Sequence, residues 1–134
     1  MDEKWFVGTI KSDQNSWIVR ALSFLPDFDT RTENSNLIVI KWNYGGDAMP
    51  DSETLDKILH FEDAIFDAME SESWGFEAAT LTGDGTKEWR IYAQEINSFM
   101  EGFNAALVGH QPYPLDLQMF SDPEWTGLSE LQTS

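Results

Sequence analysis

The sequence predicts an α+β fold in which a ferredoxin-like βαββαβ antiparallel sheet carries two helices on one face and is preceded by an N-terminal β-hairpin. Two observations lead to it: a long amphipathic stretch over residues 50–71, and short β-branched and aromatic runs separated by turn residues. A chain of 134 residues fits one domain. We divide it into a hairpin (5–24), a ferredoxin-like core (36–121) and a tail (122–134).

The chain begins with two strand-like runs, 5–10 and 17–24, joined by the polar residues 12–16. The length of that connection predicts a hairpin with a loop rather than a tight two-residue turn. Residues 25–35 are rich in charged and turn-forming side chains and are expected to form a surface loop.

The first half of the core pairs a strand with a helix. Residues 36–44 contain a nearly continuous apolar run, which predicts a central strand covered on both faces. Proline and acidic residues then open a helix over 50–71. The apolar positions of this helix recur at three- and four-residue steps: Leu55, Ile58, Leu59, Ile65, Phe66 and Met69. Glu62 lies in the middle of this apolar face, where an aliphatic residue is expected.

The second half of the core repeats the pattern. Residues 74–82 and 87–93 are strands around the turn Gly83-Asp84-Gly85. The alternation of the second strand places Trp89 and Ile91 on one face and Arg90 and Tyr92 on the other. A helix over 94–108 stops at Gly109, and 114–120 forms the last strand with Leu115, Leu117 and Met119 facing together. Residues 122–134 are expected to be a frayed tail or a short helix.

The composition limits the classes of function. The 24 acidic side chains against 8 basic ones give a net charge of −16, which disfavours nucleic acid and anionic membranes as partners. The chain has no cysteine, so disulfides, thiol nucleophiles and thiolate metal sites are excluded. Residues 1–10 lack the pattern of a signal peptide, and no apolar run is long enough to span a bilayer. A cytoplasmic protein is expected.

A family resemblance rests on three groups of residues: the proline-opened helix with an internal Glu62-Asp63, the glycine turn followed by an aromatic strand (83–93), and the Asp122–Trp125 segment after the last strand. With these features the chain, over residues 17–131, resembles DUF695, a bacterial protein family of unknown function. The resemblance is compatible with the predicted fold and implies no established activity. The acidic α+β character is also similar to that of the bacterial regulator that inhibits ribonuclease E.

Glu62 is the sharpest chemical signal, and it has two interpretations. A carboxylate on a buried helix face is costly unless it is paired or hydrogen-bonded. It is therefore either a site residue that binds a cation or moves a proton, or a structural acceptor for a buried Trp, Tyr, Lys or Arg donor. The structural role is favoured by about two to one, because satisfied groups are the rule in cores.

Other catalytic patterns are missing. The acidic sets Asp27 with Asp29, and Asp47 with Asp51 and Glu53, lack the spacing of a calcium loop. His60 and His110 are far apart in the sequence and form no HExxH pair. No GxSxG elbow or phosphate loop occurs. We therefore expect no metal, no cofactor and no enzymatic activity.

The aromatic residues supply a second candidate. Most of the aromatic side chains at strand ends and turns are expected to fill the core. The candidate binding residues besides Glu62 are Trp89, Arg90, Tyr92 and Trp125, and Tyr92 beside Arg90 on the outer face of the sheet is expected to form an exposed patch ringed by acid, as at an interface. The N-terminal hairpin is the alternative cover for that face.

The leading hypothesis is a non-enzymatic inhibitor, immunity-type or regulatory module that binds a basic, nucleic-acid-processing protein. The alternative is a small-molecule-binding or hydrolytic domain that uses Glu62 with Arg90 or Tyr92 in a pocket between helix and sheet. A structural homo-oligomer joined through sheet edges is the third.

Overall fold

A computed structural model describes residues 4–12, 15–46 and 50–132. Its elements, in chain order, are β1 (Trp5–Ser12), β2 (Asn15–Leu22), α1 (Phe28–Glu33), β3 (Asn36–Asn43), α2 (Ser52–Glu72), β4 (Phe76–Gly83), β5 (Thr86–Ala93), α3 (Ile96–Ala106), β6 (Leu115–Ser121) and α4 (Thr126–Gln132). Among these residues no helix is long and apolar enough to cross a membrane.

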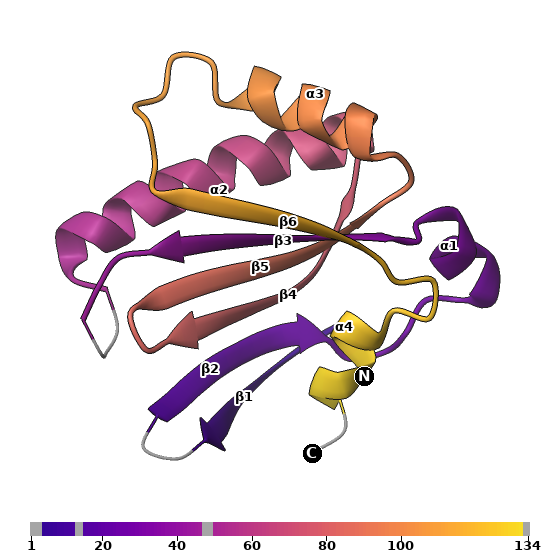
Figure 1. Ribbon diagram of the computed structural model, residues 1–134, viewed down its shortest axis with the longest axis horizontal. Coiled ribbons are helices and arrows are strands. Elements are labelled where there is room, and N and C mark those ends of the chain that lie inside the picture. Colours follow the sequence, from indigo (N-terminus) through magenta and orange to yellow (C-terminus); the bar gives the residue numbers. More distant parts are fainter. Residues whose placement is uncertain (1–3, 13–14, 47–49, 133–134) are drawn as a thin grey trace.

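The strands form one antiparallel sheet in the order β1-β2-β4-β5-β3-β6 (Figure 1). Helices α2 and α3 lie over one face of this sheet, and α4 lies against the other. The predicted α+β class is confirmed. The N-terminal hairpin extends the sheet, because β2 pairs with β4 from Ile18↔Thr82 to Ala21↔Ala79. The order of the whole six-stranded sheet therefore differs from that of a four-stranded ferredoxin-like sheet.

The larger core lies between the sheet and the two long helices. Side chains that alternate on β3 and β5 point to this side, including Ile40 and Trp89, which are fully buried. Phe61 of α2 packs edge-to-face on Trp89 at a centroid distance of 5.0 Å. Leu115, Leu117 and Met119 of β6 share this face, as the strand pattern predicts.

A second, smaller core covers the opposite face of the sheet. Helix α4 contributes Leu128 and Leu131, which pack with Val19, Val39 and other side chains of the strands. The predicted tail is thus a short helix, and residues 133–134 lie outside the described part. Both faces of β3 and β5 are buried, which confirms the prediction that 36–44 is a central strand.

Two of the expected loops are different in the structure. Helix α1 occupies part of the predicted surface loop 25–35, because the Asp27 side chain caps it by accepting a hydrogen bond from the Thr30 N–H at 2.8 Å. The predicted connection 12–16 is shorter than expected, since the strands pair up to Ser12↔Asn15. Residues 13 and 14 lie outside the described residues. The turn at Asp84-Gly85 is confirmed, and both residues have positive φ.

The buried side of α2 is rotated relative to the prediction. Its fully buried residues include Ile58, Phe61 and Ile65, whereas Leu55 and Leu59 are about half exposed. The prediction that Leu55 and Leu59 belong to the core is wrong, and Phe61, which the predicted stripe lacks, is buried instead. Glu62 consequently lies at the edge of the core rather than at its centre.

We predict that Gly102→Ala destabilises the protein. A Cβ at residue 102 of α3 would overlap the Trp74 indole, and this ring is itself buried. Overpacking costs about 1–3 kcal/mol, more than the ~1 kcal/mol that alanine contributes over glycine in a helix. Urea unfolding measures the loss. Asn104→Ala, at an exposed position of the same helix, is the control, and equal stability of the two variants would contradict the prediction.

Candidate functional site

Glu62 is held at the edge of the helix-side core by two donors. Its Oε2 accepts a hydrogen bond from Trp89 Nε1 at 2.7 Å, and Lys87 Nζ lies 3.4 Å from the same oxygen. The side chains of Glu62 and Lys87 are each 17% exposed. Because β5 alternates, Lys87 and Trp89 both point toward α2 and meet the carboxylate together. This arrangement is the structural acceptor that the sequence argument favoured.

Arg90, Tyr92 and Trp125 form a separate network on the other face. Tyr92 and Trp125 stack with ring centroids 3.9 Å apart and planes 7° apart, and the Tyr92 hydroxyl donates to Asp122 Oδ2 at 2.6 Å. Asp122 also accepts from the backbone N–H groups of Thr126 and Gly127, each at 2.9 Å. This carboxylate thereby ties β5 to the first turn of α4.

Arg90 completes the attachment of α4. Its guanidinium donates to Glu88 Oε2 at 2.7 Å, to the Gly127 carbonyl at 2.6 Å and to Glu130 Oε1 at 2.8 Å. Arg90 therefore joins β5 to α4, because Glu88 belongs to β5 whereas Gly127 and Glu130 belong to α4.

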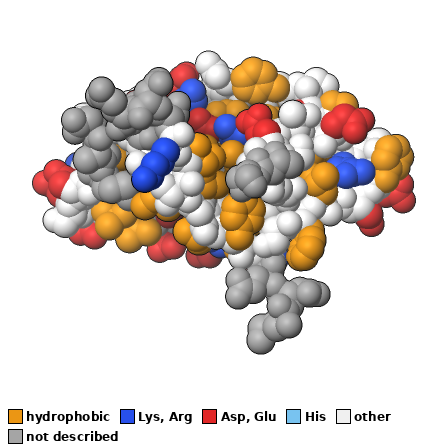
Figure 2. All heavy atoms as spheres, turned by 90° about the horizontal axis from the view of Figure 1, so that it is seen from below, with side chains coloured by type: hydrophobic (Ala, Val, Ile, Leu, Met, Phe, Trp, Pro, Cys, Tyr) orange, Lys and Arg blue, Asp and Glu red, His pale blue; other side chains and the backbone are white. Residues whose placement is uncertain are grey.

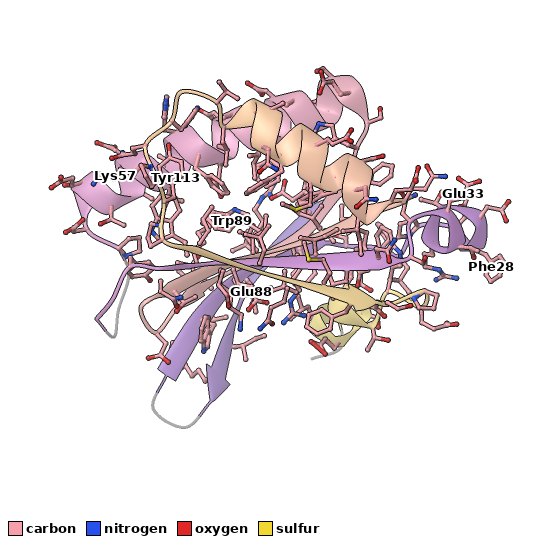
Figure 3. The ribbon with its side chains drawn as sticks, turned by 45° about the horizontal axis from the view of Figure 1, so that its top comes forward. Phe28, Glu33, Lys57, Glu88, Trp89 and Tyr113 are labelled. Carbon is pink, nitrogen blue, oxygen red and sulfur yellow. The ribbon has the colours of Figure 1, made fainter. Side chains whose placement is uncertain are left out.

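The structure separates the residues that the sequence argument grouped into one site. Trp89 lies on the helix side of the sheet and Glu88 on the opposite side (Figure 3). Glu62 therefore cannot meet Arg90 or Tyr92 in one pocket. The expected exposed patch is also wrong: Tyr92 and Trp125 are 0% and 1% exposed, because α4 covers that face.

A polar cavity of about 290 Å³ lies beside Glu62, between α2 and strands β2, β4 and β5. Its cations are Arg20 and Lys87, and Glu77 of β4 faces Arg20 with 3.3 Å between Oε2 and Nη1. Asp63 and Asp67 line it from α2. The cavity thus contains two cations and four carboxylates, each cation paired with one carboxylate.

An apolar groove of about 700 Å³ continues from this cavity. Arg20, Phe66 and Glu77 line both. The Arg20 guanidinium lies over the Trp5 ring, 3.9 Å from its centroid, and so forms a cation–π contact at the junction. The remaining apolar part is lined by side chains including Leu22, Phe24, Leu25, Met69 and Phe76.

Among the carboxyl groups that line this cavity, Glu77 has a shifted pKa. Burial raises the pKa of its carboxyl above the ordinary value, the Arg20 cation opposes this, and the charge of Glu62 adds to the increase. Perturbed carboxyl groups that line a cavity are candidates for ligand contact.

Sequence reasoning did not identify Arg20, Glu77 or Lys87. The sequence shows these three residues only as charged side chains within strand-like segments. The alternation of each strand turns them toward the face that α2 covers. The pairing of β2 with β4 brings Arg20 opposite Thr80 and close to Glu77, and the sequence does not specify that pairing.

Other sequence candidates have structural roles or new neighbours. Asp51 caps α2 by accepting from the Thr54 N–H at 2.8 Å, while Asp47 lies outside the described residues. His60 and His110 stack with centroids 4.7 Å apart, although 50 positions separate them. Within the residues described, no group of three or more His, Asp or Glu side chains is arranged to hold a metal ion.

We predict that Glu62→Ala destabilises the fold more than Glu62→Gln. The amide keeps an acceptor for the Trp89 N–H and loses only the charge attraction to Lys87. The alanine leaves the indole donor without its partner at a cost of about 1–3 kcal/mol. Urea unfolding distinguishes the two. Equal losses would mean that the ion pair, not the hydrogen bond, dominates.

The Asp122 network predicts a dependence of stability on pH. Burial opposes ionisation of Asp122, but hydrogen bonds from Tyr92, Gly127 and Thr126 together hold its pKa below the ordinary 3.8. Its contribution is therefore complete above that value and is lost as the pH falls below it. Burial and the bond to Asp122 raise the pKa of Tyr92 far above 10.0, so its contribution is present below pH 10.0 and lost above it.

The check is the free energy of unfolding of Asp122→Asn and Tyr92→Phe relative to the parent protein. We expect the Asp122→Asn deficit to shrink below pH ~4 and the Tyr92→Phe deficit to shrink above pH ~10. Deficits that stay constant with pH would show that these groups do not titrate differently on unfolding.

The comparison with known proteins gives one finding on relationship. The model of a protein family described as "Family of unknown function (DUF695)" matches residues 3–131, which is nearly the whole chain. No curated protein matches the sequence. The family match includes the strands and helices that form both sides of the polar cavity. The chain therefore belongs to the DUF695 family.

Proposed function

We propose that this protein is a non-enzymatic binding module, an inhibitor, immunity-type or regulatory protein that captures a basic, nucleic-acid-processing partner. The observation that carries this proposal is the distribution of charge on α2. Six acidic side chains of this helix are exposed, against the single lysine Lys57: Glu53, Asp56, Asp63, Asp67, Glu70 and Glu72.

Four of these acids form one stripe along the helix. Asp56, Asp63, Asp67 and Glu70 are separated by seven, four and three positions, which places them on the same side at 3.6 residues per turn. The stripe borders the polar cavity through Asp63 and Asp67. An ordered row of like charges on a rigid helix provides a directed field for a basic protein.

The geometry gives no support to the hydrolytic alternative. Arg90 and Tyr92 lie across the sheet from Glu62 and are engaged with α4, so the three residues form no shared site. The cavity beside Glu62 favours a second candidate function, the binding of a small molecule. Such a ligand would have to be cationic, because carboxylates outnumber cations four to two in that cavity.

We also propose that residues 36–121 form a ferredoxin-like unit. The support is the order β4-β5-β3-β6 within the larger sheet, with α2 and α3 on one face. The hairpin β1–β2 extends this unit at β4.

The test is affinity capture from a lysate of cells that produce the protein, at low salt and then at rising salt. We expect one dominant basic, nucleic-acid-processing protein, released as the screening length falls from about 10 Å at 0.1 M to about 3 Å at 1 M. A variant that neutralises the stripe (Asp56→Asn, Asp63→Asn, Asp67→Asn and Glu70→Gln) should lose this protein even at low salt.

The matched control removes the same charge elsewhere, at the exposed residues Glu33, Glu101, Asp116 and Glu124. It should retain the partner at low salt. Capture of no basic protein, or equal loss by both variants, would contradict the proposed function.

A further inference from the structure

Part of the helix-side face of the sheet lacks a helix above it. The described core residues under α2 and α3 come from β3, β5, β6 and the segments next to them, and none comes from β1 or β2. The groove is instead lined by the hairpin, by the segment that follows it, and by Phe66, Met69 and Glu70 of α2. Hydrophobic side chains are visible among charged ones on the underside of the molecule (Figure 2).

The groove has an acidic wall on α2, while Arg20 and Lys87 on the sheet are already engaged and Lys4 lines only the apolar end. Asp63 and Asp67 line the polar end, and Glu70 lines the apolar end. On the opposite wall, Arg20 pairs with Glu77 and Lys87 pairs with Glu62. The excess charge of the polar end is therefore negative, so it attracts a cationic group and repels a phosphate.

The apolar end offers exposed surface for more than one side chain. Phe24 and Phe76 line it and are 65% and 49% exposed. Phe66 joins the two ends, because it lines both the groove and the polar cavity. Burial of such rings contributes about 1.5–3 kcal/mol each when a partner covers them fully.

We propose that this groove binds a segment of the partner protein that carries a lysine or arginine next to apolar side chains. The cationic group enters the polar cavity beside Glu77, Asp63 and Asp67, and the apolar side chains lie on Phe66, Phe76 and their neighbours. This inference rests on the proposed function and names the chemistry of the partner at that surface.

Charge complementarity favours this occupant over the others. A second copy of this chain carries a net charge of −16 and would bring acid to an acidic wall. Nucleic acid would bring phosphates to the same wall. The raised pKa of Glu77 fits as well, since burial outweighs the charges of Arg20 and Lys87 and a further cation would stabilise the ionised carboxylate.

The experiment is a titration followed by ¹H–¹⁵N NMR at about 0.15 M salt, where the screening length is about 8 Å. The probe is the peptide acetyl-Leu-Leu-Arg-Phe-Leu-amide, and its control contains citrulline, the neutral isostere of arginine. We expect saturable shifts confined to the segments that line the groove and the polar cavity, namely residues 4–5, 20–30 and 62–80 and the neighbourhoods of Lys87 and Trp125. The citrulline peptide should bind at least tenfold more weakly.

Two pairs of variants provide matched controls. Asp63→Asn with Asp67→Asn should weaken binding severalfold, whereas Glu101→Gln with Asp116→Asn removes the same charge from exposed positions of α3 and β6 outside the groove and should not. Phe76→Ser should weaken binding, whereas Phe120→Ser, on β6 at a similar exposure of 48%, should not.

Several results would overturn the inference. These are no saturable shift at millimolar peptide, shifts spread over the whole acidic surface, or equal weakening by both members of a pair. Concentration-dependent shifts of the groove residues without peptide would identify a second copy as the occupant. A basic protein that is captured equally by the groove variants and the parent protein would place docking elsewhere and leave the proposed function intact.

Discussion

The central strand β5 must be buried on both of its faces, and the rest of the structure depends on this constraint. Its alternation sends Trp89 toward α2 and Tyr92 toward α4, and both rings are fully buried. Each ring carries one polar group that needs a partner when buried. Glu62 accepts from Trp89 and Asp122 accepts from Tyr92, so each helix layer is fixed to the same strand by one carboxylate.

The two carboxylates have different consequences. Asp122 is enclosed with the first turn of α4 and has no role left for a ligand, because Tyr92 and two backbone N–H groups surround it. Glu62 lies where the helix layer ends, so its other side borders an open cavity. Both carboxylates accept a hydrogen bond from a buried aromatic donor. Asp122 is enclosed and attaches α4 to the sheet, whereas Glu62 lies at the edge of a candidate binding surface.

The excess of acidic side chains affects both the stability of the fold and the electric field around it. Within the described residues, Arg20 and Lys87 of the groove pair with Glu77 and Glu62, and the lysine of α2, Lys57, pairs with Glu53. The acids of α2 therefore outnumber the cations near them. Repulsion among these like charges slightly destabilises the folded state, and their negative field accelerates association with basic molecules. The groove adds an apolar surface beside this acid, so the two features together form the candidate binding surface.

Local periodicity and turn chemistry predicted the order of the six strands and the two long helices, the turn at Asp84-Gly85, and the burial of β3 on both of its faces. They did not determine which strand the hairpin pairs with, or that 122–132 would fold back to bury Tyr92 and Trp125. Both features come from the packing of the whole fold, which also brings Arg20, Glu77 and Glu62 together around one cavity. The physical reason is that strand pairing across long sequence separations depends on the packing of whole faces, which no local pattern records.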